Sequence, residues 1–148
     1  MPGDPPSSAA ANAAVPLRRL RADQRLQVCN ATRSSLVVQE LSLALSPWRR
    51  LRGLLGLREL RPGQGLLLLP CNGVHTLFMT FAIDVLFLDD EGRVVELRAV
   101  LPPWRATPLF GAALAALELP AGQAATTGTT RGDRLIFEPA GEPTCSGV

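Results

Sequence analysis

The stretch that decides the fold is CNGVHTLFMTFAIDVLFLDD, residues 71–90. From residue 77 to Phe87 every odd position is apolar, which is the period of two expected of a β-strand that lines a core. A strand over residues 77–88 is long, so we predict a bend or break near residues 80–82. Phe78 and Met79 are expected in the core. The Asp-Asp-Glu-Gly run at 89–92 predicts a hairpin turn, because aspartate and glycine tolerate a positive φ.

Further β-strands are predicted on both sides of this stretch. Their segments are short, rich in leucine and valine, and separated by Gly, Pro or Asn turn signals. Residues 93–101 form the second strand of the hairpin. The other predicted strands are residues 25–30, 35–44, 66–69, 117–120 and 134–137.

One helix is predicted at residues 46–56. Ser46 suits the N-cap, Pro47 the first helical position and Gly56 the C-terminal stop. The alanine-rich residues 109–117 are compatible with a second short helix. The predicted class is therefore α+β and mainly antiparallel β: a small curled sheet or barrel-like β domain with one short helix around residues 46–56.

Length and composition indicate the domain organisation. The chain has 148 residues, 47% of them hydrophobic, which suits one globular domain. We expect a disordered leader at 1–16, a single β-rich domain at 17–138 and a flexible tail at 139–148. The N-terminus lacks the features of a secretory signal and no stretch is long enough for a membrane span. We therefore expect a soluble, cytoplasmic monomer.

The net charge of +2 argues against a nucleic-acid partner. All 15 cationic side chains are arginine, which we attribute to codon bias. Three scattered cysteines, Cys29, Cys71 and Cys145, are too few for a disulfide framework.

Several phrases recur in a fixed order and resemble a known family. They are RGLLG at 52–56, GLLL at 65–68, HTLFM at 75–79, IDVLFLD at 83–89, LELPAG at 117–122 and Gly-Asp at 132–133. Their order and spacing resemble the bacterial and archaeal family called domain of unknown function 192, over roughly residues 49–137. The resemblance implies a compact, β-rich α+β domain and names no function.

Two departures from the family pattern affect what the resemblance implies. An arginine that commonly follows the RGLLG phrase is replaced by Leu57, unless Arg58 substitutes for it. The insert between Met79 and Asp84 is shorter than the common form. Many members of the family resemble exported or envelope-attached proteins, and this chain lacks their leader.

Asp84 and Glu118 are the candidate acidic residues. Each stands among apolar neighbours, and a buried carboxylate needs a hydrogen bond or an ion pair. We interpret Asp84 first as a hydrogen-bond anchor for a nearby turn, and second as a ligand or acid/base group. The family resemblance suggests Arg52 as its partner. If Asp84 and Glu118 converged, they would form an acidic pair with raised pKa values.

Cys71 and His75 are the second candidate pair. On a loop, their spacing could place a thiolate beside an imidazole, as nucleophile and base or as two metal ligands. A zinc site needs three or four ligands and the chain has one histidine, so we predict no metal and no cofactor. A buried thiol and a hydrogen-bonded histidine remain the simpler interpretation.

These residues define a site without a reaction. We predict a small non-catalytic binding or accessory domain for an unknown small molecule or protein, with a cleft near residues 71–84. The predicted ligand-binding residues are Arg52, His75, Asp84, Trp104 and Glu118. One alternative is a hydrolase or transferase that uses Cys71 and His75, or Asp84 and Glu118. The other is a protein-interaction module of envelope or secretion machinery.

Overall fold

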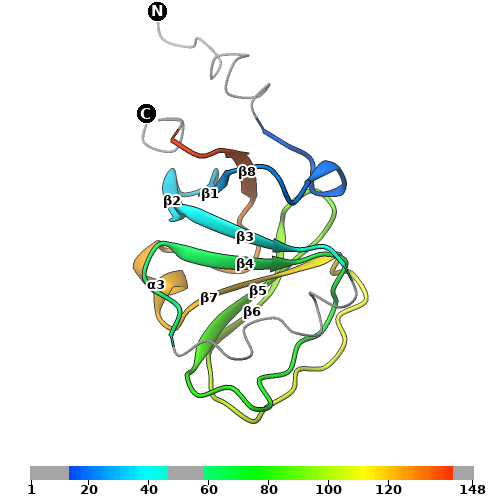
Figure 1. Ribbon diagram of the computed structural model, residues 1–148, viewed down its shortest axis with the longest axis vertical. Helices are drawn as coiled ribbons and strands as arrows, with labels where there is room; N and C mark the ends of the chain where they lie inside the picture. Colours follow the sequence, from blue (N-terminus) through cyan, green and yellow to red (C-terminus); the bar gives the residue numbers. More distant parts are fainter. Residues whose placement is uncertain (1–13, 47–58, 142–148) are drawn as a thin grey trace, which may run out of the picture.

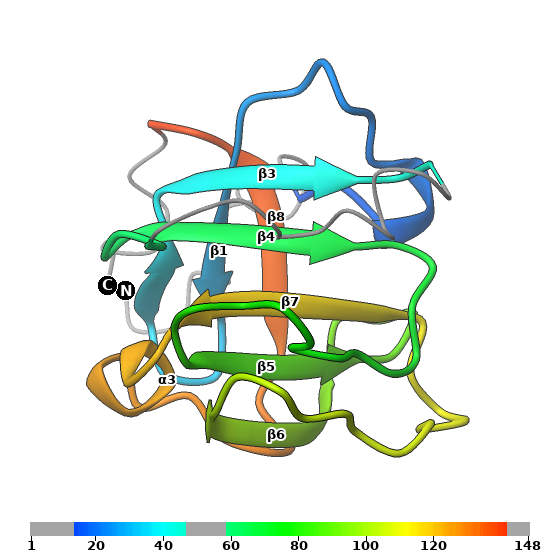
Figure 2. The ribbon, with the colours of Figure 1, turned by 60° about the horizontal axis from the view of Figure 1, so that its bottom comes forward.

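The strands form two sheets that cross each other. The computed structural model describes residues 14–46 and 59–141. The smaller sheet has the order β2-β1-β8 and the larger one the order β3-β4-β7-β5-β6. Figure 2 shows the larger sheet in that order from top to bottom, with the smaller sheet running across behind it. The strands are β1 (Leu26–Asn30), β2 (Ser35–Val38), β3 (Glu40–Ala44), β4 (Gln64–Leu68), β5 (Ile83–Leu88), β6 (Val94–Leu101), β7 (Ala115–Pro120) and β8 (Leu135–Pro139).

The predicted class is confirmed. All neighbouring strands are antiparallel except β3 and β4, which are parallel. Within the described ranges the helices are a 3-10 turn, η1 (Leu17–Arg19), and the short α3 (Gln123–Thr126). The described strands form open sheets and not a closed barrel. The helix predicted at residues 46–56 falls almost entirely on residues 47–58, outside the described part.

The larger sheet is apolar on both faces, because each strand alternates its side chains between them. The inner face packs on the smaller sheet (Figure 1), and its core includes Val28, Phe137, Leu86 and Leu117. The outer face carries a second cluster: Ala44, Leu66, Leu68, Met79, Ile83, Val85, Phe87 and Ala116. In Figure 2 the loops that follow β4 and β6 lie across the lower part of this outer face.

The hairpin turn at residues 89–92 is as predicted, but the segment 35–44 is not one strand. It breaks at Gln39, and its two halves enter different sheets as β2 and β3. The backbone N–H groups of Gln39 and Glu40 both donate to the carbonyl oxygen of Gly63, at 2.7 and 3.0 Å. Two successive N–H groups cannot turn to one carbonyl within a regular strand, because successive residues of a strand face opposite directions.

The strand predicted over residues 77–88 is half as long as expected. Only Ile83–Leu88 is β-strand, and it is buried throughout. Met79 is buried as predicted, but the core position predicted for Phe78 is wrong, since 70% of Phe78 is exposed. Phe78 has a φ of 65°, which takes the chain out of the extended conformation.

The helix predicted from the alanines at 109–117 is also wrong. Ala115 and Ala116 begin β7, the central strand, which pairs with β4 on one side and β5 on the other. Small side chains fit there because both faces of the strand are covered. Tertiary packing therefore overrides the helical propensity of alanine.

Candidate functional site

Asp84, at the start of β5, is fully buried on the inner face of the larger sheet. Its Oδ1 accepts a hydrogen bond from the N–H of Val100 at 2.8 Å, and its Oδ2 accepts one from the N–H of Ala124 at 2.9 Å. Ala124 lies in the first turn of α3, and the N-cap residue Gly122 has no side chain to offer. Both carboxylate oxygens are engaged by backbone, which fits the anchoring role expected for Asp84.

Glu118 lies on β7 at the centre of the same sheet and is 4% exposed. Its register partners are Leu66 of β4 and Val85 of β5. The buried Oε2 has no hydrogen-bond partner among the described residues. Burial raises the pKa of Glu118 from 4.5 to about 8. The carboxyl group is therefore mostly protonated at neutral pH.

The arginine in the same row of side chains does not neutralise Glu118. Arg98 pairs with Val85, so it lies on the same face two strands away from Glu118, a separation of about 10 Å. Its guanidinium carbon lies 5.4 Å from the centroid of the Phe110 ring, in a cation–π contact. Glu118 thus remains an uncharged acid in an apolar layer.

Asp84 and Glu118 do not converge. Asp84 is paired with Leu119, and Val85 with Glu118. Directly paired residues share a face, and successive residues alternate, so the two carboxyl groups lie on opposite faces of the sheet. The acidic pair considered from the sequence is not formed.

Cys71 and His75 occupy the loop after β4. Cys71 is partly buried, and its Sγ donates a hydrogen bond to the carbonyl oxygen of Gly73 at 3.0 Å. His75 is exposed, its backbone bridges to Ala106, and its imidazole makes no hydrogen bond to any described residue. No group of three or more His, Cys, Asp or Glu side chains within 14–46 and 59–141 is arranged to hold a metal ion. Cys71 and His75 therefore lie on the same loop, and the hydrogen bond from the thiol to Gly73 goes to the backbone.

Thr76 joins the two loops that cover the outer face. It is fully buried. Its Oγ1 donates to the carbonyl oxygen of Pro102 at 2.6 Å and accepts from the N–H of Arg105 at 2.9 Å. Its own N–H and C=O bond to Arg105 and Trp104 at 2.7 and 2.9 Å. This role was not predicted, since a threonine within an apolar run has no distinctive pattern.

Trp104 and Phe78 meet where these loops are joined. Their ring centroids are 4.8 Å apart, with the ring planes inclined at 59°. Both residues have positive φ, 64° for Trp104 and 65° for Phe78. Non-glycine residues seldom adopt this conformation, and where it occurs it is concentrated at binding and active sites. Of the predicted ligand-binding residues, Trp104 and His75 are exposed on these loops, Asp84 and Glu118 are buried in the sheet, and Arg52 lies outside the described residues.

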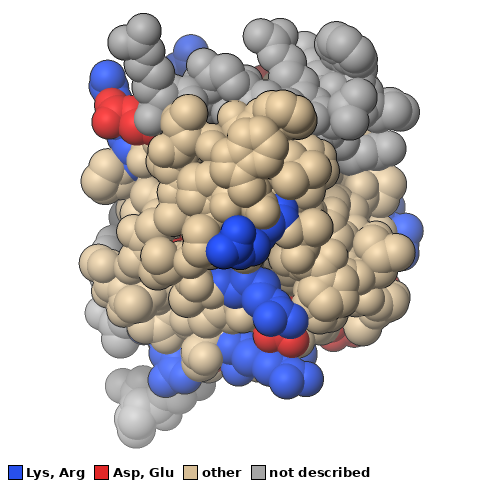
Figure 3. All heavy atoms as spheres, turned by 90° about the horizontal axis from the view of Figure 1, so that it is seen from below, with Lys and Arg blue, Asp and Glu red and all other residues tan. Residues whose placement is uncertain are grey.

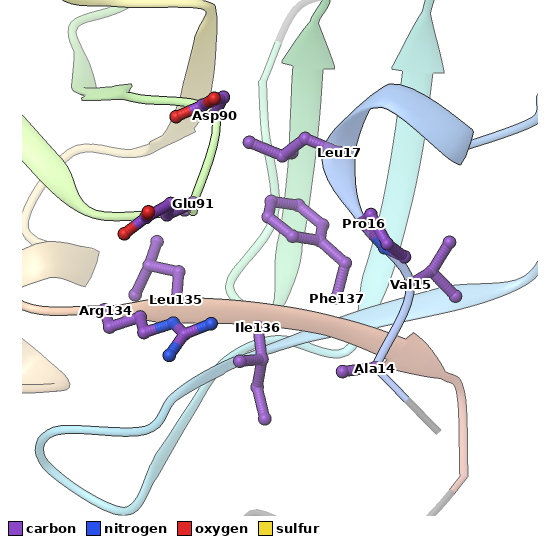
Figure 4. Close-up of a pocket in the computed structure, with 11 residues that line it drawn as sticks. Ala14, Val15, Pro16, Leu17, Asp90, Glu91, Arg134, Leu135, Ile136 and Phe137 are labelled. Carbon is purple, nitrogen blue, oxygen red and sulfur yellow. The ribbon is translucent and has the colours of Figure 1, made fainter. Parts of the chain in front are cut away.

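Two hollows were not predicted from the sequence. One, of about 350 Å³, is enclosed by residues 14–17, the turn at 90–92 and β8. Figure 4 shows Asp90 and Glu91 on one side of it, Leu17 and Pro16 on the other, and Phe137 between them. The second, of about 580 Å³, lies between the start of β6 and residues 109–112, with Arg93 and Arg131 at its rim. Neither contains an unpartnered buried polar group comparable to Glu118 in the described ranges.

No helix in the described ranges is long and apolar enough to cross a membrane. The family model DUF192, described as Uncharacterized ACR, matches residues 28–137. A search of curated proteins finds no match.

Two crystal structures are similar. One is a protein of unknown function from Novosphingobium aromaticivorans DSM 12444, 26% identical, with a TM-score of 0.66, covering 85% of this chain and 95% of the other. The second, a candidate transcription regulator from Sinorhizobium meliloti 1021, is 22% identical with a TM-score of 0.61, covering 76% and 91%, and supports the fold alone.

Proposed function

Since this chain belongs to the uncharacterised family DUF192, we propose its function from its own geometry: a small non-catalytic domain that binds a small molecule over the outer face of the larger sheet. The observation that carries the proposal is the buried Glu118 carboxyl, whose Oε2 has no partner among the described residues. Buried polar groups are almost always hydrogen-bonded, so an exception calls for a functional or structural reason.

The chemistry of Glu118 defines the ligand. A protonated carboxyl donates one hydrogen bond, and the surrounding side chains Leu66, Val85 and Ile83 are apolar. The ligand is therefore a largely apolar, uncharged molecule with one hydrogen-bond acceptor, such as a carbonyl or ether oxygen. An anionic ligand is disfavoured, because the apolar side chains around Glu118 would leave its charge without a counter-ion.

Parts of the chain that flank Glu118 suit this role. Met79 and Phe81, from the loop after β4, pack in the same outer cluster. The loop at residues 71–82, where the cleft was predicted, thus covers the face of the sheet that carries Glu118, while Asp84 lies on the opposite face. We place the protein in the cytoplasm as a monomer, as the sequence led us to expect.

The enzyme alternative has less support. One form of it needs Asp84 beside Glu118, and the strand register places these two residues on opposite faces of the sheet. The other form needs a thiolate at Cys71, whose Sγ donates a hydrogen bond to the carbonyl oxygen of Gly73. A protein-interaction module would need an exposed surface that does not include Glu118, because Glu118 is buried.

Native mass spectrometry of freshly purified protein tests the proposal. Wild type is expected to carry a co-purified small molecule, and Glu118→Leu is expected to lose it. Glu40→Gln, at an exposed position on β3 of the same sheet, should retain it. Wild-type protein that is free of ligand, or a ligand that Glu118→Leu retains in full, would count against binding at Glu118.

A further inference from the structure

Large apolar side chains are exposed together at one end of the molecule. Phe78 is 70% exposed and Trp104 55%, and they stand on the two joined loops near the end of β6. We call this group the loop-end surface; its members are Leu77, Phe78, Val100 and Trp104. Leu109, which is 76% exposed, lies apart from it, at the hollow beside the start of β6. Such clustering marks an interaction site, whereas single exposed apolar residues are ordinary.

The backbone holds these side chains outward. Phe78, Val100 and Trp104 all have positive φ values, between 50° and 65°. For a β-branched residue such as Val100 this is a genuine outlier. The N–H of Val100 is held by Asp84, and the N–H of Trp104 by the carbonyl of Thr76. The surrounding hydrogen bonds thus fix the exposed conformation.

The charged side chain on the two loops that carry the loop-end surface is an arginine, Arg105. The two loops, residues 70–82 and 102–114, contain no aspartate or glutamate. Arg105 and Arg98 are exposed on and beside them. In Figure 3, which views the molecule from the end where the loops lie, the described surface is mostly uncharged and is crossed by a band of arginine side chains. An anionic partner complements this surface.

We propose that the loop-end surface docks on a lipid bilayer that contains anionic headgroups. Trp104 and Phe78 enter the boundary between headgroups and acyl chains, while Arg98 and Arg105 contact lipid phosphates. Aromatic side chains favour that boundary, and stable peripheral binding needs both an apolar and a basic contribution. A bilayer suits protruding side chains, because it accepts them without a matching cavity.

A protein partner fits these observations less well. A peptide usually binds in a groove, and of the two hollows described above neither is lined by Phe78 or Trp104. The inference is independent of the proposed function, since Glu118 is no part of this surface.

Co-sedimentation with vesicles tests the inference. The full chain is expected to sediment with an equal mixture of phosphatidylcholine and phosphatidylglycerol, and far less with phosphatidylcholine alone. Trp48 and Trp104 are the only tryptophans in the sequence. In a Trp48→Phe variant, tryptophan fluorescence therefore comes from Trp104 alone. Its emission should shift to shorter wavelength when the mixed vesicles are added, because the indole leaves water.

Single substitutions locate the contact. Trp104→Ala and Phe78→Ala should each weaken binding to mixed vesicles roughly tenfold, because each removes a large apolar side chain from the boundary. Arg105→Gln should weaken it several-fold and reduce its dependence on salt. The matched control is Arg134→Gln, at the exposed position just before β8 of the other sheet, which should bind as wild type does. Circular dichroism shows whether each variant is folded.

Two outcomes would overturn the inference. Folded protein that stays in the supernatant with mixed vesicles at low salt excludes a bilayer and leaves a protein as the occupant of this surface. Sedimentation that is unchanged in both Trp104→Ala and Phe78→Ala places the lipid contact elsewhere on the chain.

Discussion

Oδ2 of Asp84 accepts a hydrogen bond from the N–H of Ala124 at 2.9 Å, so a strand residue caps the first turn of α3. The other oxygen, Oδ1, holds the N–H of Val100 at the end of β6. One buried carboxylate thus fixes both the short helix and the irregular end of the hairpin, which is where the loop that carries Trp104 begins.

Asp84→Asn should therefore destabilise the protein by about 2–4 kcal/mol, because an amide can accept only one of the two hydrogen bonds and its NH₂ then opposes an N–H donor. Urea unfolding measures the loss, and hydrogen exchange should show faster exchange at Ala124 or Val100. The control is Asp90→Asn, at an exposed position of the hairpin turn, which should change stability little. Equal stabilities of wild type and Asp84→Asn would contradict the anchoring role.

The alternation of apolar residues predicted a strand correctly where the period of two was followed by turn residues such as aspartate and glycine. The hairpin of β5 and β6 is an example, since its turn needs glycine at position 92, where φ is 81°. The same alternation misled at residues 77–82. There the conformation depends on hydrogen bonds from Thr76 to the loop after β6. That loop is distant in the sequence, so a local pattern cannot predict these bonds.

The candidate site was predicted only in part. Glu118 was recognisable as an acid between leucines, but its face of the sheet depends on its pairing with Val85, which is a long-range contact. Phe78 was assigned to the core because apolar side chains usually lie there. Phe78 is exposed because its backbone has a positive φ, and a phenylalanine side chain does not predict that conformation.

The raised pKa of Glu118 makes stability depend on pH. The folded protein holds the proton up to about pH 8, whereas the unfolded chain releases it near the ordinary value of 4.5. Between these values the unfolded state binds fewer protons, so the free energy of unfolding should fall as pH rises, by roughly 1.4 kcal/mol per pH unit at most. Urea unfolding from pH 5 to pH 8 measures this slope.

Glu118→Gln should remove this part of the slope, because glutamine does not ionise. Glu118→Leu should also be more stable than wild type at pH 8, since it replaces a carboxyl group that lacks a partner by an apolar side chain. The exposed Glu40→Gln serves as control and should keep the wild-type slope. A wild-type slope that survives in Glu118→Gln would show that another group carries it.

Gly92 is predicted to be the least replaceable glycine of the described turns. An added Cβ would lie 2.3 Å from the carbonyl oxygen of Leu135, and the φ of 81° is unfavourable for any other residue. Gly92→Ala should cost more than about 3 kcal/mol in thermal or urea unfolding, because the backbone of β8 must move. Gly128 has φ 70° and no atom near an added Cβ. Gly128→Ala should therefore cost only about 1 kcal/mol, and equal losses in the two variants would exclude the steric explanation.

Thr76→Val tests whether the buried hydroxyl fixes the two loops. Valine has the same shape, but it leaves the carbonyl of Pro102 and the N–H of Arg105 without their partner, at a cost of about 2–3 kcal/mol. Hydrogen exchange should accelerate at Arg105 and at neighbouring amides of residues 104–107, while the amides of β1 and β8 keep their protection. Thr80→Val, at an exposed position of the same loop, controls for the change of residue type. Protection of Arg105 that persists in Thr76→Val would show that the backbone hydrogen bonds alone hold the loops together, and that Phe78 and Trp104 keep their exposed positions without the hydroxyl.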